Sequence, residues 1–558
     1  MKQLIECVPN FSEGRDLNII KQITDCIEAV EGVKLLNVDP GKATNRTVVT
    51  FVGEPAAVTE AAFQAIRKAG ELIDMSKHKG EHPRMGATDV CPLIPISGIS
   101  MEETARWAQT LGQRVGNELG IPVYLYEAAQ ANKNRSNLSV IRAGEYEGFF
   151  KKIKLPEWKP DFGAGEFDAK RGATVIGARD FLVAYNINLN TTSTRRANAI
   201  AFDVREAGRT QKDDKGNVVK DAAGNPIVIP GSLKSVKAIG WYIEEYGVAQ
   251  ISMNLTNISV TPVHIAFDEV CRRAEARGLR VTGSELVGLI PLHALLDAAR
   301  YFLRKQQRST GVSEAELIKI AVKSLGLDEL GPFKPEERII EYLLRDAADS
   351  KLVSMRLDAF ADETASESPA PGGGSISAYM GALGVALGTM VANLSSHKRG
   401  WDDRWEAFSD VAEKGQELQK ELIKLVDEDT RAFNRIMDAF GLPKGTDEEK
   451  AARTAAIQAA TLYATQVPLR VMEVAAAGFD LVHNMAANGN PNSVSDAGVG
   501  ALALRSAVMG AYLNVKINAA GLSDKAAAAD LIARGKAIQD KALADEAAVL
   551  AVVNEKIG

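Results

Sequence analysis

The sequence predicts a multidomain protein: two α/β subdomains with antiparallel-type sheets, followed by an all-α helical bundle. Three observations predict this fold class. Short β-branched stretches alternate with amphipathic helical stretches over about the first 300 residues, the strand signal then disappears, and the remainder is rich in long helical stretches. At roughly 150 residues per domain, a chain of 558 residues holds three or four folding units.

The first subdomain follows the split-βαβ order, which builds an antiparallel sheet with helices on one face. The expected elements are a strand over 4–11, a helix over 16–30, strands over 33–38 and 46–52, a helix over 54–73 and a strand over 88–96. A helix near Met101 and a strand over 123–126 extend this ferredoxin-like arrangement.

A second subdomain repeats the same order. Its expected elements are a strand over 181–189, a helix over 195–206, strands over 236–243 and 249–255, a helix over 263–277 and a strand over 279–281. Residues 212–230 carry Asp-Lys-Gly-Asn and Gly-Asn-Pro turn signals, which predict an exposed hairpin insert.

The carboxyl-terminal part reads as an up-and-down bundle. Helices are expected over 313–325 and 335–344, and then over 376–396, 405–440, 446–478, 496–519 and 523–553. We therefore divide the chain into an amino-terminal α/β subdomain (1–180), a second α/β subdomain (181–330), a helical linker (331–350) and a helical domain (351–558).

Composition excludes several classes of function. The net charge is −6 and no Lys/Arg-rich run occurs, so neither nucleic acid nor an anionic membrane is an expected partner. The four cysteines form no CxxC pair, so no disulfide framework or zinc site is signalled. The amino terminus reaches Glu6 before an apolar signal-peptide core could form, which predicts a cytoplasmic protein.

Residues 368–396 carry no charge and resemble a membrane span. Gly381, Gly384 and Gly388 would permit close helix contact within it. The segment is rich in Gly, Ala and Ser rather than in Leu, Ile and Phe, and we expect it to be the only such stretch. We therefore predict a central helix of the bundle and no membrane span.

His82 lies in a polar loop, Lys79-Gly80-Glu81-His82-Pro83-Arg84, that leads into a predicted strand. The following proline biases its backbone away from helix. An imidazole there titrates near neutral pH and can accept a proton. The alternative is a surface-loop histidine with no catalytic role.

Asp429 is anomalous because it falls on an apolar helix stripe, four residues from both Leu425 and Phe433. Burial would raise its pKa toward the range used in acid–base catalysis, unless a cation or hydrogen-bond donors offset the desolvation. Asp427 is expected on the solvated side, about 200° away around the helix. The alternative for Asp429 is a buried structural carboxylate. The full stripe comprises Leu422, Leu425, Val426, Phe433, Ile436 and Met437.

Two further polar clusters fall in the same domain. Pro371-Gly372-Gly373-Gly374-Ser375 opens a helix, so backbone N–H groups near Ser375 could face an anionic or electron-rich ligand. Asn490 belongs to a dense turn, and Asn514 lies on the helix that follows. Capping and turn formation explain some of these residues equally well.

These residues, taken with longer signatures, resemble the bifunctional formimidoyltransferase-cyclodeaminase family over nearly the whole chain. The amino-terminal signatures are Glu6-Cys7-Val8-Pro9-Asn10-Phe11-Ser12-Glu13-Gly14, Thr44-Asn45-Arg46-Thr47-Val48, Ile141-Arg142-Ala143-Gly144-Glu145-Tyr146-Glu147, Pro160-Asp161-Phe162-Gly163 and Gly172-Ala173-Thr174. The bundle contributes Ala370-Pro371-Gly372-Gly373-Gly374-Ser375, Leu425-Val426-Asp427-Glu428-Asp429 and Gly510-Ala511-Tyr512-Leu513-Asn514-Val515.

The resemblance implies two linked reactions of histidine breakdown. The formimino group of N-formimino-L-glutamate moves to N5 of tetrahydrofolate, and 5-formiminotetrahydrofolate then cyclises to 5,10-methenyltetrahydrofolate with release of ammonia. Tetrahydrofolate is a co-substrate and no metal is required. The family also implies a ring-like homo-oligomer that handles folate polyglutamates.

The resemblance assigns roles to particular residues. His82 matches the catalytic histidine and Asp429 the catalytic aspartate. Arg46 and Arg84 are candidates for binding substrate carboxylates, because a guanidinium group can hold a carboxylate with two hydrogen bonds; the alternative is structural pairing. Further candidates for substrate binding are Gly373, Ser375, Asn490 and Asn514. The folate-binding loop is expected at Gly163, Ala164, Gly165, Glu166, Phe167, Asp168, Ala169, Lys170, Arg171 and Gly172, although its central residues depart from the vertebrate type.

Two alternatives remain open from sequence. One is a monofunctional formimidoyltransferase whose bundle serves only to form oligomers. The other is a folate-binding scaffold without turnover. Separate assays of formimino transfer and of ammonia release distinguish the three.

Overall fold

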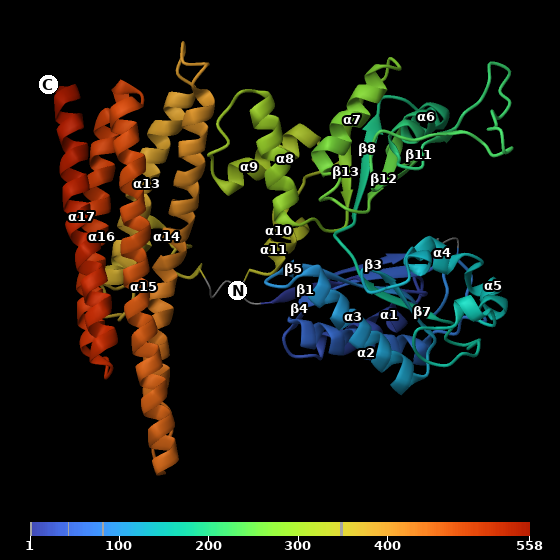
Figure 1. Cartoon of the computed structure of the whole chain (residues 1–558), viewed down its shortest axis with the longest axis horizontal. Coiled ribbons are helices and arrows are strands. Elements are labelled where there is room, and N and C mark those ends of the chain that lie inside the picture. Colours follow the sequence, from blue (N-terminus) through green and yellow to red (C-terminus); the bar gives the residue numbers. More distant parts are fainter. Residues whose placement is uncertain (1–2, 43, 81–82, 346–349) are drawn as a thin grey trace. The chain divides into compact units, whose positions relative to one another are not determined.

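The computed structural model describes residues 3–42, 44–80, 83–345 and 350–558 (Figure 1). The chain divides into two compact units. The first comprises Met1–Ala294 and Leu325–Leu344, and the second comprises Leu295–Ser324 and Arg345–Gly558.

The first sheet of unit 1 has seven strands. These are β1 (Leu4–Cys7), β2 (Asn10–Phe11), β3 (Val33–Gly41), β4 (Arg46–Gly53), β5 (Thr88–Ser97), β6 (Val123–Glu127) and β7 (Thr174–Ala178). Apolar residues of α1 (Leu17–Glu28), α2 (Pro55–Leu72) and α3 (Met101–Arg114) join strand residues in one core, so these helices cover one face of the sheet (Figure 1).

This sheet corrects two expectations. It is mixed rather than antiparallel throughout, because β7 pairs in parallel with both β5 and β6. Strand β7 is short and follows a polar loop, so the sequence pattern did not predict it. The strand expected over 4–11 is also broken at Val8-Pro9, where proline supplies no backbone N–H to the ladder.

The second sheet has the order β11-β12-β8-β13 and is antiparallel. Its strands are β8 (Val183–Leu189), β11 (Val236–Ile243), β12 (Val248–Leu255) and β13 (Val281–Val287), and α6 (Thr194–Val204) and α7 (Val263–Glu275) accompany them. The last strand begins where the predicted one, 279–281, ended. Gly283 interrupts the strand pattern, so the sequence did not predict the rest of this strand. The pairing of β13 with β8 shifts register there. A Cβ at position 283 would come within 2.7 Å of the Gly326 carbonyl oxygen.

The predicted hairpin insert is confirmed. Strand β9 (Arg209–Thr210) pairs with β10 (Val228–Ile229), and most residues between them are exposed. The remaining helices of unit 1 are α4 (Leu138–Arg142), α5 (Glu145–Lys152), α10 (Pro335–Arg338) and α11 (Ile340–Leu343), whereas α8 (Leu292–Lys305) and α9 (Glu314–Leu325) fall almost wholly in unit 2. The helix expected over 335–344 is split because Ile339 is extended and bridges Ile290.

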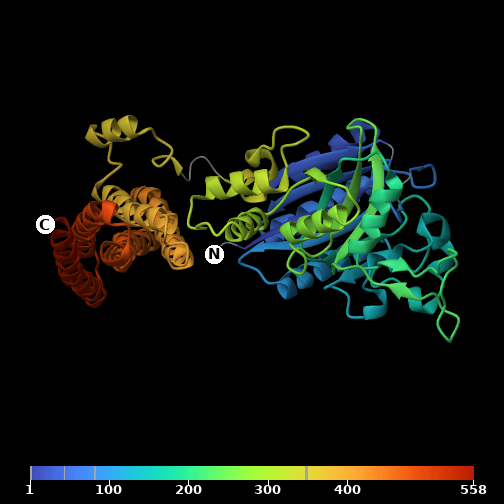
Figure 2. The ribbon, with the colours of Figure 1, turned by 90° about the horizontal axis from the view of Figure 1, so that it is seen from above.

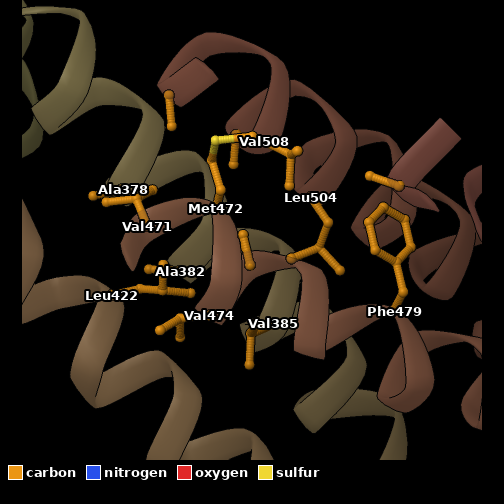
Figure 3. Close-up of a cluster of buried hydrophobic side chains, with 14 of the residues drawn as sticks. Ala378, Ala382, Val385, Leu422, Val471, Met472, Val474, Phe479, Leu504 and Val508 are labelled. Carbon is orange, nitrogen blue, oxygen red and sulfur yellow. The ribbon is translucent and has the colours of Figure 1, made fainter. Parts of the chain in front are cut away.

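Unit 2 is dominated by long helices joined by short loops, which Figure 2 views nearly end-on. They are α13 (Gly373–Ser396), α14 (Trp405–Phe440), α15 (Asp447–Asn488), α16 (Val494–Ala520) and α17 (Lys525–Ile557), preceded by α12 (Leu357–Ala365). Their shared core includes Val385, Leu422 and Leu504 (Figure 3). Helix α15 runs ten residues past the predicted end because Gly478 is a packing glycine, 3.0 Å from Leu504 if it carried a Cβ, and not a stop signal.

Glycines let α13 approach its neighbours closely. A Cβ at Gly384 would lie 2.8 Å from the Gly500 carbonyl oxygen on α16, and one at Gly388 would lie 2.1 Å from Leu481 Cδ2 on α15. These contacts agree with the close helix packing that the sequence predicts for this segment.

Two described helices, Gly373–Ser396 and Pro491–Ala520, are long and apolar enough to cross a membrane by length and composition alone. The expectation of a single such stretch is therefore wrong, because charged residues in the second are sparse as well. Within the chain, 61% of the apolar window of the first and 50% of that of the second are buried.

We expect Gly384→Ala to destabilise the bundle by about 1–3 kcal/mol, because the added methyl group meets backbone atoms of α16 that cannot rotate away. Thermal unfolding of the full chain measures the change. Gly148→Ala on α5 is the matched control, because a Cβ there meets nothing within 4 Å. Equal unfolding midpoints for the two variants would contradict the close approach.

Candidate active sites

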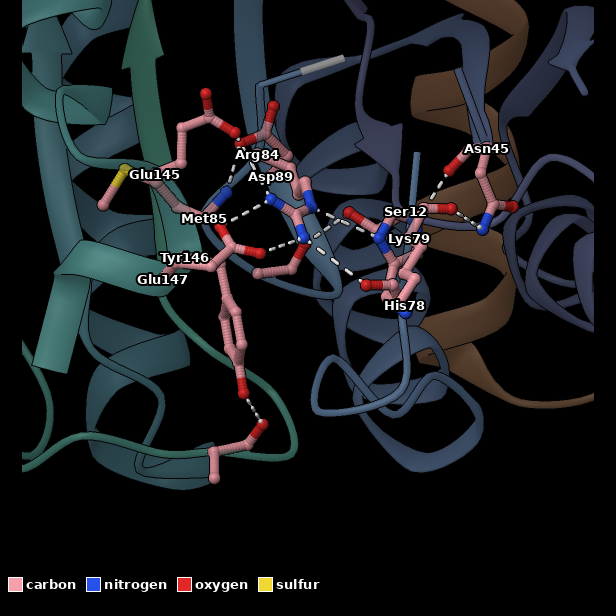
Figure 4. A network of polar contacts seen from close by, with 12 residues as sticks. Ser12, Asn45, His78, Lys79, Arg84, Met85, Asp89, Glu145, Tyr146 and Glu147 are labelled. Carbon is pink, nitrogen blue, oxygen red and sulfur yellow. Dashed lines mark hydrogen bonds and ion pairs between the residues drawn. The ribbon is translucent and has the colours of Figure 1, made fainter. Parts of the chain in front are cut away.

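The first site is a network of charged side chains around Arg84 (Figure 4). Glu147 accepts two hydrogen bonds from the guanidinium, at 2.8 and 2.6 Å, and Glu145 accepts one at 3.3 Å. Arg84 also donates from Nε to His78 Nδ1 at 3.3 Å and from Nη2 to the His78 carbonyl oxygen at 3.4 Å. All five N–H donors of Arg84 are thus engaged, and its side chain is only 8% exposed.

A second charged group lies deeper in the same subdomain. Asp89, on β5, is fully buried, receives the backbone N–H of Met85 at 2.9 Å and pairs with Arg142 at 2.6 Å. Burial raises the pKa of Asp89, and the positive charges of Arg142 and Arg46 oppose that rise. Burial also lowers the pKa of Arg46 to about 10, although Asp89 counteracts it. Arg46 and Arg84, both predicted to bind substrate, therefore lie in adjoining charged clusters.

His82 and Glu81 lie outside the described residues. The segments on either side are tied to the subdomain. Asn45 receives the backbone N–H of Gly14 and donates to the Lys79 carbonyl oxygen, both at 3.0 Å. On the other side, Ser12 Oγ donates to the Gly86 carbonyl oxygen at 2.7 Å.

The predicted folate loop, 163–172, joins this region at its end. The Ala87 N–H donates to the Arg171 carbonyl oxygen at 2.8 Å, and Gly86 and Gly172 form an antiparallel bridge. Neither glycine has room for a Cβ, and Gly172 has φ +70°. Tyr146, beside Glu147, donates from its hydroxyl to the Ala169 carbonyl oxygen at 2.6 Å.

Within the loop, Phe167 packs among the rings of Tyr146, Phe149 and Phe150, with centroids 5.5–6.3 Å apart. Asp168 pairs with Arg171. The loop is therefore held by its own contacts, whereas Gly163, Ala164, Gly165 and Glu166 are exposed.

Sequence reasoning missed four members of this region: His78, Asp89, Arg142 and Glu147. For two of the four a signal was present, because the signature 141–147 groups Arg142, Glu145 and Glu147 in one short charged run. Their partners, 53 to 63 residues away, could not be read from the sequence.

The second site lies at the start of helix α13. The side chain of Asp429, on α14, reaches the first turn of α13, where Ser375 donates to it from its backbone N–H and from Oγ at 3.2 Å. A Cβ at Gly374 would lie 2.1 Å from Asp429 Oδ1. The N-cap residue, Gly372, provides no side-chain cap, so the carboxylate of a neighbouring helix satisfies this turn.

Burial raises the pKa of Asp429, and the hydrogen bonds from Ser375 oppose the rise. This direction confirms the sequence prediction. Asp429 as a whole residue is half-buried. A carboxyl group with a raised pKa is suited to proton transfer near neutral pH.

Three of the predicted substrate-binding residues lie near Asp429, and one lies far from it. Asn514, on α16, lies beside Gly373, where a Cβ would be 3.3 Å from Asn514 Nδ2. Asn490 lies at the opposite end of α13, where its backbone N–H donates to Ser395 Oγ at 2.8 Å. Within one chain, Gly373, Ser375, Asp429 and Asn514 form one cluster and Asn490 is remote from it.

Two expectations for α14 are wrong. Asp427 is 5% exposed, not solvated, because it accepts the backbone N–H groups of Leu352 at 2.8 Å and Val353 at 3.3 Å. Phe433 and Met437 are 40% and 54% exposed, although the apolar stripe predicts burial. Asp429 is level with the first turn of α13, so these later residues of α14 extend beyond the helix that covers Leu422 and Leu425.

Among the described residues, no three His, Cys, Asp or Glu side chains gather to hold a metal ion. A cavity of about 570 Å³ lies beside the hairpin insert and is lined by Phe202, Asp203, Arg209, Lys212 and neighbouring residues. It contains none of the predicted site residues.

Known proteins resemble the chain over both units. Models of the formiminotransferase domain match residues 4–179 (its amino-terminal subdomain) and 184–345, and a formiminotransferase-cyclodeaminase model matches residues 356–537. The formimidoyltransferase-cyclodeaminase of Gallus gallus is 46% identical over 94% of each chain. A glutamate formimidoyltransferase of Thermoplasma acidophilum is 44% identical over 54% of this chain and 92% of its own. A methenyltetrahydrofolate cyclohydrolase of Methylorubrum extorquens is 44% identical over 30% of this chain and 82% of its own.

The α/β unit and the helical unit, each with its own polar site, together define a bifunctional enzyme with a transferase part and a cyclodeaminase part. The chain belongs to the formimidoyltransferase-cyclodeaminase family.

The raised pKa of Asp429 has a consequence for stability. The folded chain binds this proton more tightly than the unfolded chain, so the folded state loses stability as pH rises through the unfolded and then the folded pKa. Asn cannot ionise and escapes this loss. We expect Asp429→Asn to raise the unfolding midpoint at pH 7, with a gain that shrinks toward pH 3. Calorimetry across this range measures it, with exposed Asp438→Asn on the same helix as control. A lower midpoint at pH 7 would show that the carboxylate stabilises the fold.

Proposed function

We propose that the two units catalyse consecutive steps of histidine degradation. The α/β unit transfers the formimino group of N-formimino-L-glutamate to N5 of tetrahydrofolate. The helical unit converts 5-formiminotetrahydrofolate to 5,10-methenyltetrahydrofolate and ammonia, which is lyase chemistry. Membership of the family over 94% of the chain supports both steps.

In the first step, the N5 lone pair attacks the amidine carbon, and the bond from that carbon to the glutamate nitrogen then breaks. A base must take the proton from N5, and the departing glutamate nitrogen must receive one. We assign the base to His82. The anchored segments that flank it, next to two arginine clusters, support this assignment.

We assign substrate binding to loop 163–172 and to Arg46. The link from this loop to Gly86 and Tyr146 supports a folate site there. Arg84 is less suited to hold a substrate carboxylate, because all its donors are engaged and it would have to release a glutamate first. Its contacts favour a role in holding the site together.

In the second step, N10 attacks the formimino carbon and the bond to the terminal nitrogen breaks as ammonia leaves. Ammonia must gain a proton and N10 must lose one. We assign this proton transfer to Asp429, and substrate contacts to Gly373, Ser375 and Asn514. The observation that carries this proposal is the Asp429 carboxyl group held against the first turn of α13, in the space that Gly374 leaves free.

Other assignments follow from the sequence pattern or from the family and remain proposals. They are a cytoplasmic location, a ring-like homo-oligomer, folate polyglutamates as substrates, a reaction without metal, and boundaries at 1–180, 181–330, 331–350 and 351–558. Asn490 is retained only as a residue that another subunit of such an oligomer would contribute.

Two variants separate the steps. We expect His82→Ala to abolish formimino transfer while ammonia release from supplied 5-formiminotetrahydrofolate persists. We expect Asp429→Asn to do the reverse, with a fall of about 10²-fold or more in ammonia release. Glutamate release and ammonia release, measured separately, check both. Loss of both activities in either variant would contradict the proposal of two separate sites. Persistence of ammonia release in Asp429→Asn would show that Asp429 is not catalytic.

We also expect Gly374→Ala to lower ammonia release at least tenfold without affecting formimino transfer. The added Cβ would lie 2.1 Å from Asp429 Oδ1 and displace the carboxyl group. Gly521→Ala, beyond the end of α16, is the control, since the nearest atoms to a Cβ there lie 3.4 Å away. Full ammonia release in Gly374→Ala would show that the position of Asp429 is unimportant.

A further inference from the structure

His78 connects the segments that the α/β unit is proposed to use for substrate binding (Figure 4). Its Nε2 lies 2.8 Å from the Asn45 carbonyl oxygen, next to Arg46 in the sequence. Its Nδ1 lies 3.3 Å from Arg84 Nε. His78 is half-buried between these two partners.

The partners determine the protonation state of the ring. Arg84 Nε has only a hydrogen to offer, so His78 Nδ1 must accept and carry no proton. The Asn45 carbonyl oxygen can only accept, so Nε2 must carry one. Both contacts are satisfied together only by the neutral ring with its hydrogen on Nε2.

Arg84 connects His78 to helix α5. Its guanidinium pairs with Glu147 and Glu145, at the start of α5. Tyr146, between them, donates from its backbone N–H to the Arg84 carbonyl oxygen at 2.8 Å and from its hydroxyl to Ala169 in loop 163–172. One imidazole thus links the Asn45–Arg46 segment to α5 and, through Tyr146, to the proposed folate loop.

We propose that His78 is a positioning residue of the transferase site and that it acts only as the neutral Nε2–H tautomer. Protonation of Nδ1 would remove the acceptor of Arg84 Nε and place two cations in contact. The inference deepens the proposed transferase function and rests on it for its kinetic readout.

The charges around His78 come from three segments. Arg84 faces it from its own loop, Glu13 and Arg15 from the segment before α1, and Glu147 from α5. Burial, together with the positive charge of Arg84, holds the pKa of His78 below its usual range, although the hydrogen bond to Asn45 opposes this. The network therefore persists at neutral pH and weakens as the solution becomes acidic.

Two substitutions separate the contacts of the ring. The amide oxygen of Asn occupies the place of Nδ1, so His78→Asn keeps an acceptor for Arg84. The amide of Gln reaches the place of Nε2, so His78→Gln keeps only the contact with Asn45. We expect His78→Gln to lower kcat for formimino transfer at least tenfold at pH 7.5 with less than a twofold change in KM. We expect His78→Asn to keep a kcat at least fivefold above that of His78→Gln.

The pH dependence of the transfer activity is a second test, because a purely structural role of His78 would not change it. Asn does not titrate, so the ratio of wild-type to His78→Asn activity should fall as the pH is lowered from 7.5 to 5.5. Exposed His397→Asn, in the helical unit, is the control and should leave transfer unchanged. Equal kcat values for the Asn and Gln variants, or a constant activity ratio across pH, would overturn the proposal.

A spectroscopic measurement separates this inference from the proposed function. In the full chain labelled with ¹⁵N in its histidine rings, the signals that vanish in His78→Asn belong to His78. We expect them to report the neutral Nε2–H tautomer at pH 7.5. An imidazolium or an Nδ1–H tautomer would overturn the inference even if the wild-type protein transfers formimino groups. Absence of transfer by the wild-type protein would instead refute the proposed function. The tautomer of His78 would then be decided by the spectra alone.

Discussion

The contact between the Asp429 carboxyl group and the first turn of α13 is the constraint on which the helical site depends. A carboxylate from one helix completes the backbone hydrogen bonding of another, and it can do so only because Gly374 leaves space for it. The same arrangement removes the carboxyl group from bulk water and raises its pKa. Helix packing, glycine placement and proton affinity at this site therefore have one physical origin.

The α/β unit uses close backbone approach in a related way. Gly86 and Gly172 approach each other where no side chain would fit. Their contact joins the segment between Arg84 and β5 to the end of loop 163–172. Around this junction, buried charges are paired: Asp89 with Arg142, and Arg84 with two glutamates. Removing Arg142 or the glutamates would leave the buried charge of Asp89 or Arg84 with fewer partners, so these residues support the site through each other.

Much of this architecture was predictable from sequence, because it rests on local periodicity. Most long helices and most strands lie within a few residues of their predicted bounds, although α15 runs ten residues further than predicted. Asp429 is recognisable in the sequence by its place on an apolar stripe. Features that depend on distant partners were not predictable. The parallel strand β7, the burial of Asp427 beneath Leu352 and Val353, and the Arg84–Glu147 pair all join segments with no sequence pattern in common. Asn490 illustrates the converse, since its polar turn suggested a site but lies at the far end of α13.

The central claim is that one chain carries two chemically independent active sites. The most direct test mixes the His82→Ala and Asp429→Ala proteins with formiminoglutamate and tetrahydrofolate, and follows the absorbance of 5,10-methenyltetrahydrofolate. Two independent sites predict that the mixture forms product although neither protein does so alone, since one variant makes the intermediate that the other consumes. A mixture as inactive as its components, under conditions where each variant retains its own partial reaction, would contradict the claim.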